Sequence, residues 1–239
     1  MALITCPECG GNLSDKAASC PHCGCPKIEF QKNHNILSDI KNDINYVCNL
    51  NDFEIVNGVL KQYKGNDSSI TLPDSVVYIG SYAFIHCPNL KDINIPNNVT
   101  DIGTYAFCGC TSLENVILSN NITVISEGAF SGCEKLQNVY IPEGRIKVIA
   151  ADAFEDCSKL YSVHLPKSIA QIFPRAFKNC YSLSIINIPC YVTELMDVFD
   201  GCDHIETVYF HNEEQKNKLA TCFDNKVQLL VEKNISRTI

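Results

Sequence analysis

This chain is built around an internal repeat, because one pattern of apolar residues returns six times between residues 77 and 210. Each copy opens with an aliphatic residue, and successive openings are 23, 23, 24, 23 and 23 residues apart. The in-phase positions are Ile79, Ile102, Ile125, Ile149, Ile172 and Leu195; Phe84, Phe107, Phe130, Phe154, Phe177 and Phe199; Cys87, Cys110, Cys133, Cys157, Cys180 and Cys202; and Leu90, Leu113, Leu136, Leu160, Leu183 and Ile205. A copy this short cannot bury its own apolar side chains. Stacked copies bury them against one another, so the repeat predicts a solenoid.

Each copy ends with a short segment that predicts a β-strand. In the third copy this segment contains the apolar residues Leu136, Val139 and Ile141, and apolar and polar residues alternate at its end. A period of two places the apolar side chains on one face of a strand. Pro142 follows, and because proline lacks an N–H group it ends the hydrogen-bonded ladder there. The phenylalanines of the stacked copies are expected to form an internal column, beside small alanines that let the coils approach closely.

The repeats also carry a family resemblance. The segment Ile102-Gly-Thr-Tyr-Ala-Phe-Cys-Gly-Cys-Thr-Ser-Leu-Glu-Asn-Val116 resembles the BspA-like class of leucine-rich repeat, and the likeness covers residues 53–210. The resemblance implies an α/β, β-rich leucine-rich-repeat solenoid that is curved. It places a parallel sheet on the concave side and short turns or helical pieces on the other side. It also implies a binding protein, frequently at the surface of bacterial or protist cells.

Both ends of the repeat array predict caps, which prevent apolar surface and strand edges from being exposed. Asn57-Gly58 lies between two apolar pairs, which predicts a hairpin over residues 53–64. Residues 51–76 would then form an N-terminal hairpin cap and a half repeat. After the six repeats of residues 77–210, residues 211–239 are expected to form a C-terminal cap and tail. In it we predict a helix over Glu213–Phe223 and a closing strand over Val227–Val231.

Residues 1–26 carry a separate motif, in which Cys6-Pro-Glu-Cys9-Gly and Cys20-Pro-His-Cys23-Gly lie ten residues apart. Two such turns offer four thiolates, which complete a tetrahedral site for one structural zinc ion. The alternative is a pair of redox Cys-x-x-Cys motifs, but these belong in a βαβ context that the segment lacks. Residues 4–26 resemble the short zinc-ribbon module at the start of many bacterial proteins. Residues 27–50 are predicted to be a polar linker.

Composition excludes several classes of function. The net charge of −8 argues against a groove for nucleic acid, whose affinity depends on lysine and arginine. The sequence has neither a signal peptide nor an apolar run of about 18 residues that would span a membrane. Fifteen cysteines without a secretion signal indicate metal ligands and reduced thiols. We therefore expect a cytoplasmic protein, and the family resemblance gives the cell surface as the alternative.

The six in-phase cysteines invite a disulfide or metal interpretation. Stacked coils would place them about 4.8 Å apart with parallel side chains. A disulfide needs Cβ atoms about 3.8 Å apart, so we predict a buried column of small apolar side chains instead. The sequence shows no glycine-rich phosphate loop, Gly-x-Ser-x-Gly motif or paired carboxylates. An enzyme is therefore not expected.

The strand residues between the buried ones predict a binding face. One row is Thr71, Asn94, Ile117, Tyr140, His164, Asn187 and Tyr209, and the other is Ser69, Asp92, Asn115, Asn138, Ser162, Ile185 and Thr207. Only one of these fourteen residues is charged, in a chain that is 19% charged. Interface cores show the same depletion and are rich in tyrosine. The alternative is that Thr, Asn and Tyr simply suit a sheet. We predict partner-binding residues at Asn94, Ile117, Tyr140, His164, Asn187 and Tyr209.

Two hypotheses about function follow from these features. The first is a non-enzymatic scaffold that binds a protein or peptide through the concave face of the solenoid, with the zinc ribbon as a second interaction module. The alternative is a nucleic-acid- or ribosome-associated factor that binds through the zinc ribbon. Salt-dependent binding of RNA would favour the alternative.

Overall fold

The computed structural model describes residues 3–5, 12–14 and 49–232 of the chain. Strands β1 (Leu3–Thr5) and β2 (Asn12–Ser14) pair antiparallel, with Thr5 opposite Asn12. They flank the first cysteine motif in the sequence. The predicted zinc ligands Cys6, Cys9, Cys20 and Cys23 lie outside the described residues, as does most of the predicted linker.

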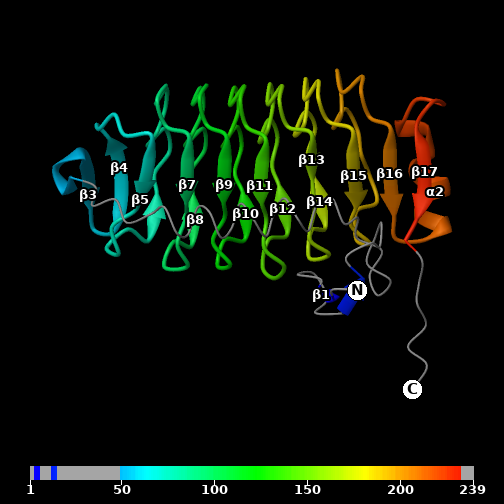
Figure 1. Ribbon diagram of the computed structural model, residues 1–239, viewed down its shortest axis with the longest axis horizontal. Helices are drawn as coiled ribbons and strands as arrows, with labels where there is room; N and C mark the ends of the chain where they lie inside the picture. Colours follow the sequence, from blue (N-terminus) through cyan, green and yellow to red (C-terminus); the bar gives the residue numbers. More distant parts are fainter. Residues whose placement is uncertain (1–2, 6–11, 15–48, 233–239) are drawn as a thin grey trace.

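The repeats form a stack of turns, and one side of the stack is a parallel sheet that we call the front sheet (Figure 1). Each turn contributes one strand, and the strands stand side by side along the long axis of the molecule. Polar and apolar residues alternate along them, so that apolar side chains such as Ile93 and Val116 point into the core. The strands are β5 (Ser69–Thr71), β7 (Asp92–Asn94), β9 (Asn115–Ile117), β11 (Asn138–Tyr140), β13 (Ser162–Val163), β15 (Ile185–Ile188), β16 (Thr207–Phe210) and β17 (Gln228–Val231).

A second row of strands, which we call the second sheet, starts with the N-terminal hairpin and continues at the leading aliphatic residues of the first five repeats. Its strands are β3 (Phe53–Val56), β4 (Val59–Tyr63), β6 (Tyr78–Ile79), β8 (Asp101–Ile102), β10 (Val124–Ile125), β12 (Val148–Ile149) and β14 (Gln171–Ile172). The sequence did not indicate this sheet, because two residues per turn are too few to show a period of two. In the described repeats, short strands and turns occupy the side where short turns or helical pieces were expected. The fold is therefore a β-solenoid with little helix.

Both sheets are interrupted where the repeat changes. Among the described strands, the front sheet breaks between β11 and β13, and the second sheet breaks between β8 and β10. One extra residue separates Pro142 from Ile146, compared with Pro96 and Val99 two turns earlier. This insertion accounts for the single 24-residue step, and it lies between β11 and β13. Across the other break, the Ser126 hydroxyl donates a 2.6 Å hydrogen bond to the carbonyl of Ile102.

The core is a column of stacked aromatic rings, as the repeat predicted. From Phe84 to Phe177, successive ring centroids are 4.8, 5.2, 5.5 and 5.2 Å apart, and the rings are nearly parallel. The caps extend the column beyond the repeats, since Tyr63 packs on Phe84 at 5.3 Å and Phe223 packs on Phe199 at 5.6 Å. The caps therefore supply the rings that an additional repeat would have supplied.

The caps have the predicted elements. Asn57 and Gly58 take positive φ values of 51° and 78° in the turn between β3 and β4, as a tight hairpin requires. The predicted C-terminal helix is α2 (Glu213–Leu219) followed by a 3₁₀ turn, η2 (Ala220–Cys222). A second 3₁₀ turn, η1 (Leu50–Asp52), leads into β3. The closing strand is β17, which pairs parallel with β16.

Candidate functional site

The predicted binding face is the outer face of the front sheet, and its rows are in register. Asn94 lies opposite Ile117, Ile117 lies opposite Tyr140, and Asn187 lies opposite Tyr209. His164 directly follows β13. The strands thus bring five of the six predicted residues together in adjacent pairs along one row. The break between β11 and β13 lies between Tyr140 and His164.

The six residues differ in what they present to solvent. Asn94, Tyr140, His164 and Tyr209 are half-buried. Ile117 is only 7% exposed, so it offers a partner little surface. The amide group of Asn187 bonds to both backbone groups of Leu165 on the neighbouring turn, at 2.8 and 2.7 Å. These bonds indicate that Asn187 holds two turns together.

The parallel row on the same face carries a ladder of polar side chains. The Asn115 amide donates to the Asp92 carboxylate at 2.6 Å, and the Asn138 amide donates to the Asn115 side-chain oxygen at 2.7 Å. Asp92 is the single charged residue of the two rows. Because an amide occupies one of its carboxylate oxygens, this charge is partly compensated. The face therefore presents mainly amide, hydroxyl and aromatic groups.

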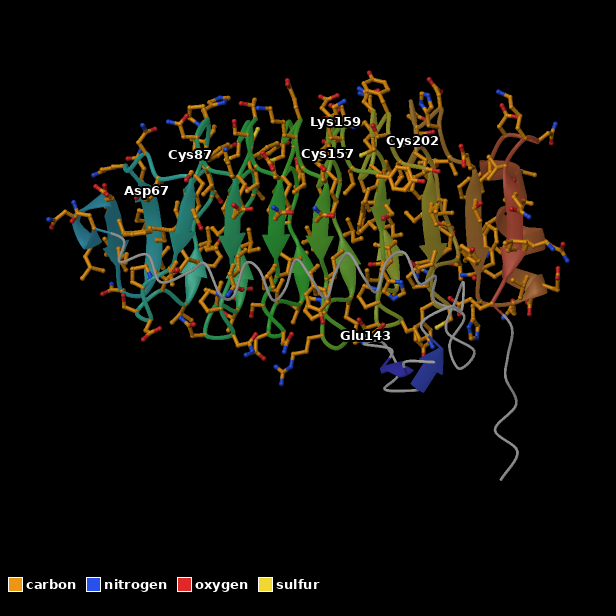
Figure 2. All side chains as sticks on the ribbon, in the orientation of Figure 1. Asp67, Cys87, Glu143, Cys157, Lys159 and Cys202 are labelled. Carbon is orange, nitrogen blue, oxygen red and sulfur yellow. The ribbon has the colours of Figure 1, made fainter. Side chains whose placement is uncertain are left out.

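The cysteine column is buried, and its thiols make a regular set of hydrogen bonds that the sequence did not indicate. Each thiol of Cys110, Cys133, Cys157, Cys180 and Cys202 donates to the backbone carbonyl of the phenylalanine that precedes it by one repeat. The sulfur–oxygen distances lie between 2.9 and 3.3 Å. Figure 2 shows Cys87, Cys157 and Cys202 at the same end of the front-sheet strands, with Glu143 at the opposite end. Burial raises the pKa of the Cys133, Cys157 and Cys180 thiols, so they remain protonated donors.

These thiols are expected to be reduced and unreactive in the native protein, because the thiolate is the reactive form. Titration in denaturant with a chelator and without reductant should approach the full fifteen thiols per chain. Among the cysteines that the structure describes, the exposed Cys222 should react first in native protein, and the five buried thiols should react only on unfolding. A shortfall of several pairs of thiols would contradict this prediction and indicate disulfides.

Two further columns lie on the turns between the second sheet and the cysteines. Their residues adopt positive φ between 52° and 72° in every repeat, whether or not they are glycine. The columns are Tyr82, Tyr105, Gly128, Asp152, Arg175 and Asp197, and His86, Gly109, Gly132, Asp156, Asn179 and Gly201. An added Cβ on Gly128 would overlap the ring of Tyr105, so a side chain from the preceding turn occupies that space.

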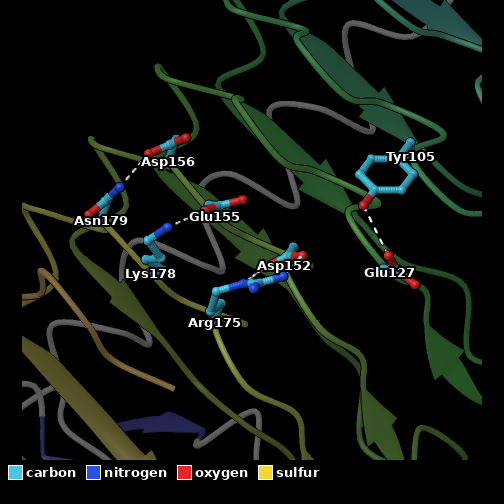
Figure 3. Close-up of polar contacts among 8 residues, drawn as sticks. All are labelled: Tyr105, Glu127, Asp152, Glu155, Asp156, Arg175, Lys178 and Asn179. Carbon is cyan, nitrogen blue, oxygen red and sulfur yellow. Dashed lines mark hydrogen bonds and ion pairs between the residues drawn. The ribbon is translucent and has the colours of Figure 1, made fainter. Parts of the chain in front are cut away.

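Polar contacts join these columns from turn to turn, as Figure 3 shows. Arg175 forms two hydrogen bonds with the carboxylate of Asp152, at 2.6 and 2.7 Å, which holds the Arg175 pKa above its usual range. Tyr105 donates to Glu127 at 3.0 Å, and this bond raises the pKa of the phenol to about 12. The contacts pair acids with donors from adjacent turns. They account for these side chains as a structural network along the stack.

The described residues contain neither a metal-binding cluster nor a membrane-spanning helix. Residues 49–232 hold no group of three or more His, Cys, Asp or Glu side chains arranged to bind a metal ion. No helix in the part of the chain that the structure describes is long and apolar enough to cross a membrane.

Comparisons with known proteins agree with this fold. The crystal structure of the T. pallidum leucine-rich repeat protein TpLRR superposes with a TM-score of 0.66 at 24% sequence identity, over 77% of this chain and 100% of that chain. A leucine-rich repeat protein from Bacteroides ovatus superposes with a TM-score of 0.61 at 31% identity. That match covers 71% of this chain and 43% of the other, so the chain spans less than half of the Bacteroides protein. No curated protein matches the chain.

The sequence also matches a family model of leucine-rich repeats. The model described as "BspA type Leucine rich repeat region (6 copies)" matches residues 54–181 and 143–238. Together these matches cover both caps and all six repeats. The chain therefore belongs to the BspA-type leucine-rich repeat family.

Proposed function

We propose that the protein is a non-enzymatic scaffold that binds a protein partner through the outer face of the front sheet. Leucine-rich repeat proteins are typically non-enzymatic and generally bind protein ligands. The observation that carries the proposal is the composition of this face. Its two rows hold fourteen residues in all, and only one of them, Asp92, is charged. A face with little charge costs less to desolvate when a partner covers it.

Within this face, Tyr140, His164 and Tyr209 are the proposed contact residues, with Asn94 towards the N-terminal end. Tyrosine offers a large contact area with few rotatable bonds, so it often contributes strongly to interfaces. His164 lies 3.9 Å from the Glu143 carboxylate at the edge of the face. Asn187 and Ile117 support the face from within the sheet.

A photo-crosslinker tests this assignment. Benzoylphenylalanine in place of Tyr140 should give discrete protein adducts in an extract of the source cells, because the residue sits in the proposed interface. The same group in place of Lys135, which is exposed on a turn, is the control. Mass spectrometry of the adducts would identify the partner. Adducts from the Lys135 position alone would place the partner on the turns and contradict the proposal.

The introduction of negative charge provides an independent test of the same face. Tyr140→Glu combined with His164→Glu should weaken binding of the partner identified by crosslinking by about 2 kcal/mol or more, the usual threshold for an interface hot spot. Lys135→Glu combined with Lys159→Glu is a suitable control, since both lysines are exposed on turns. Lys178 is unsuitable because it pairs with Glu155 at 2.9 Å. Equal loss of binding in both double variants would argue against a specific face.

We further propose that Cys6, Cys9, Cys20 and Cys23 hold one structural zinc ion, and that the resulting zinc ribbon is a second interaction module. The spacing of the four thiols supports this proposal. The pairing of Thr5 with Asn12 supports it as well, because it brings together the two ends of the segment that contains Cys6 and Cys9. A bound zinc ion would supply the fold of a segment that is too small for an apolar core.

Elemental analysis of the purified full chain should find one zinc ion per molecule. The double substitution Cys9→Ala with Cys23→Ala leaves two thiols and should abolish stoichiometric binding. Cys222→Ala is the matched control, since Cys222 is exposed and distant in sequence from the motif. Retention of zinc by the double variant would show that the metal is held elsewhere or that the motif has another role.

A further inference from the structure

Among the strands that the structure describes, the second sheet ends at β14, although the stack of turns continues. In the preceding turns, except that of β10, one backbone N–H at the start of the strand and another just after it donate to carbonyls of the turn before. Ala170 bonds to Lys147 at 2.8 Å, and Phe173 bonds to Ile149 at 2.9 Å. Among the described residues, no backbone N–H of residues 193–196 donates to β14. By the same pattern, the carbonyls of Ala170 and Ile172 face the next turn, and no hydrogen bond reaches either of them in the described structure.

The reason for this gap is visible in the sequence. Phe177 and Phe199 are 22 residues apart, whereas Ile172 and Leu195 are 23 apart, so one residue is missing between Leu195 and Phe199. The turn stays attached at its other side, where Arg175 bonds to the carbonyl of Asp197 at 2.9 Å. The front sheet also remains paired there, through β15 and β16. The shortened turn therefore parts from β14 only along the second sheet.

A surface pocket of about 390 Å³ occupies the gap. Two large apolar side chains border it: Phe173, which is 43% exposed, and Met196, which is 69% exposed. Smaller residues take the same repeat position in all four earlier turns, namely Gly80, Gly103, Ser126 and Ala150. The pocket is lined by Ala170, Gln171, Ile172, Phe173, Pro174, Thr193, Glu194 and Met196.

The polar groups of this pocket select a ligand of one kind. The two backbone carbonyls accept hydrogen bonds, and the Glu194 carboxylate adds a negative charge. Carbonyls two residues apart along a strand are separated by about 6.6 Å. A planar guanidinium can bridge this distance with N–H groups on opposite edges, whereas the compact ammonium of lysine is too short. The ring of Phe173 favours a cation, and Met196 favours an aliphatic stem.

We propose that the pocket between β14 and residues 193–196 is a second binding site, which receives an arginine side chain from a partner protein. The guanidinium would donate to the carbonyls of Ala170 and Ile172 and pair with Glu194. Its methylene groups would pack between Phe173 and Met196. The acidic net charge of the chain, −8, favours the approach of a basic partner. The site is separate from the front sheet, so it does not depend on the function proposed above.

Met196 provides a direct probe, because the chain contains only two methionines, Met1 and Met196. In the full chain labelled with ¹³C-methyl methionine, n-butylguanidinium should shift the Met196 signal saturably and leave the Met1 signal in place. The expected dissociation constant is about 1–10 mM, the range open to so few atoms. Butylammonium and the neutral butylurea should each bind at least about threefold more weakly. Butylammonium lacks the planar set of N–H donors, and butylurea lacks the positive charge.

Three variants separate this proposal from nonspecific binding. Glu194→Gln should weaken butylguanidinium binding about threefold to fivefold, as expected for an exposed ion pair. Met196→Ser should abolish binding, because a hydroxyl at this repeat position bonds to the carbonyl of the preceding turn, as Ser126 does with Ile102. Met196→Leu keeps the apolar wall and should bind like the unmodified protein. For the variants, the amide signal of Phe173 reports binding.

The opposite results would overturn the proposal. If the Met196 signal does not shift, or if all three compounds bind alike, the pocket does not recognise a guanidinium. If Glu194→Gln and Met196→Ser both bind butylguanidinium normally while remaining folded, neither the carboxylate nor the open carbonyls hold the cation. Failure of the front-face crosslinking experiment would leave this test unaffected.

Discussion

Replacing Phe154 with alanine is expected to lower the free energy of unfolding by about 3–5 kcal/mol, the usual cost of removing a fully buried aromatic ring. Phe154 is 0% exposed and stacks between Phe130 and Phe177, at centroid distances of 5.5 and 5.2 Å. The turn of Phe154 is hydrogen-bonded to the turns before and after it, through the bonds from Phe130 to Ala153 and from Phe154 to Ala176, so these turns cannot easily close over the cavity. Urea denaturation of the full chain, followed by circular dichroism, measures the change.

The matched control is Tyr181→Ala, one repeat further on, because Tyr181 is 48% exposed. This substitution should cost less than about 1 kcal/mol, as is usual for surface positions. If Phe154→Ala also costs less than about 1 kcal/mol, the ring column is not the main source of stability. In a stack where each turn contacts its neighbours, the loss can also appear as a separate early transition.

The second large effect is expected from Gly103→Ala, which should cost about 1–3 kcal/mol, as overpacking usually does. Gly103 is buried against the preceding turn, and an added Cβ would lie 2.7 Å from the carbonyl carbon of Gly80. It would also overlap the backbone nitrogen of Ser81. Both obstacles are backbone atoms, which cannot move aside as a flexible side chain can. The shift in thermal unfolding midpoint of the full chain measures the cost.

The reverse substitution at the equivalent position is the control. Ala150 occupies the place of Gly103 two turns later, so that turn already accommodates a Cβ. Ala150→Gly should therefore cost at most about 1 kcal/mol, through the greater freedom of glycine in the unfolded chain. Equal stability of Gly103→Ala and the unmodified protein would show that the first two turns can separate without loss.

The sequence predicted the features that repeat with a long and regular spacing. Phe84, Phe107 and Phe130 recur at one phase, and the structure stacks them as expected. The hairpin at Asn57-Gly58 was predictable because the turn needs residues that tolerate positive φ. The rows of the front sheet were predictable because alternation fixes which side chains point outwards. For the candidate face, the order of residues along the rows was therefore predictable from the sequence.

Other features depend on distances between turns, which a sequence does not contain. The bonds from the thiols to the phenylalanine carbonyls arise only once adjacent turns are stacked. Positive φ at Tyr82, Asp152 and Arg175 was not expected, because these residues rarely adopt it. The amide of Asn187 bonds to Leu165 on the neighbouring turn, a contact that the sequence did not indicate, and its role in partner binding stays a prediction. The signals for the pocket were present in the sequence, as Phe173 and Met196 at a small-residue position and one shortened spacing.

Among the described strands, no interruption of the front sheet lies at the same level of the stack as an interruption of the second sheet. Where the front sheet stops between β11 and β13, the second sheet is continuous through β10 and β12. Where the second sheet stops between β8 and β10, β9 and β11 are paired, and beyond β14 the pairing of β15 with β16 continues. The breaks in the two sheets are therefore staggered along the stack. A pulling force along the long axis therefore meets at least one intact ladder at each of these levels, so the irregular repeats do not divide the rod into separable pieces.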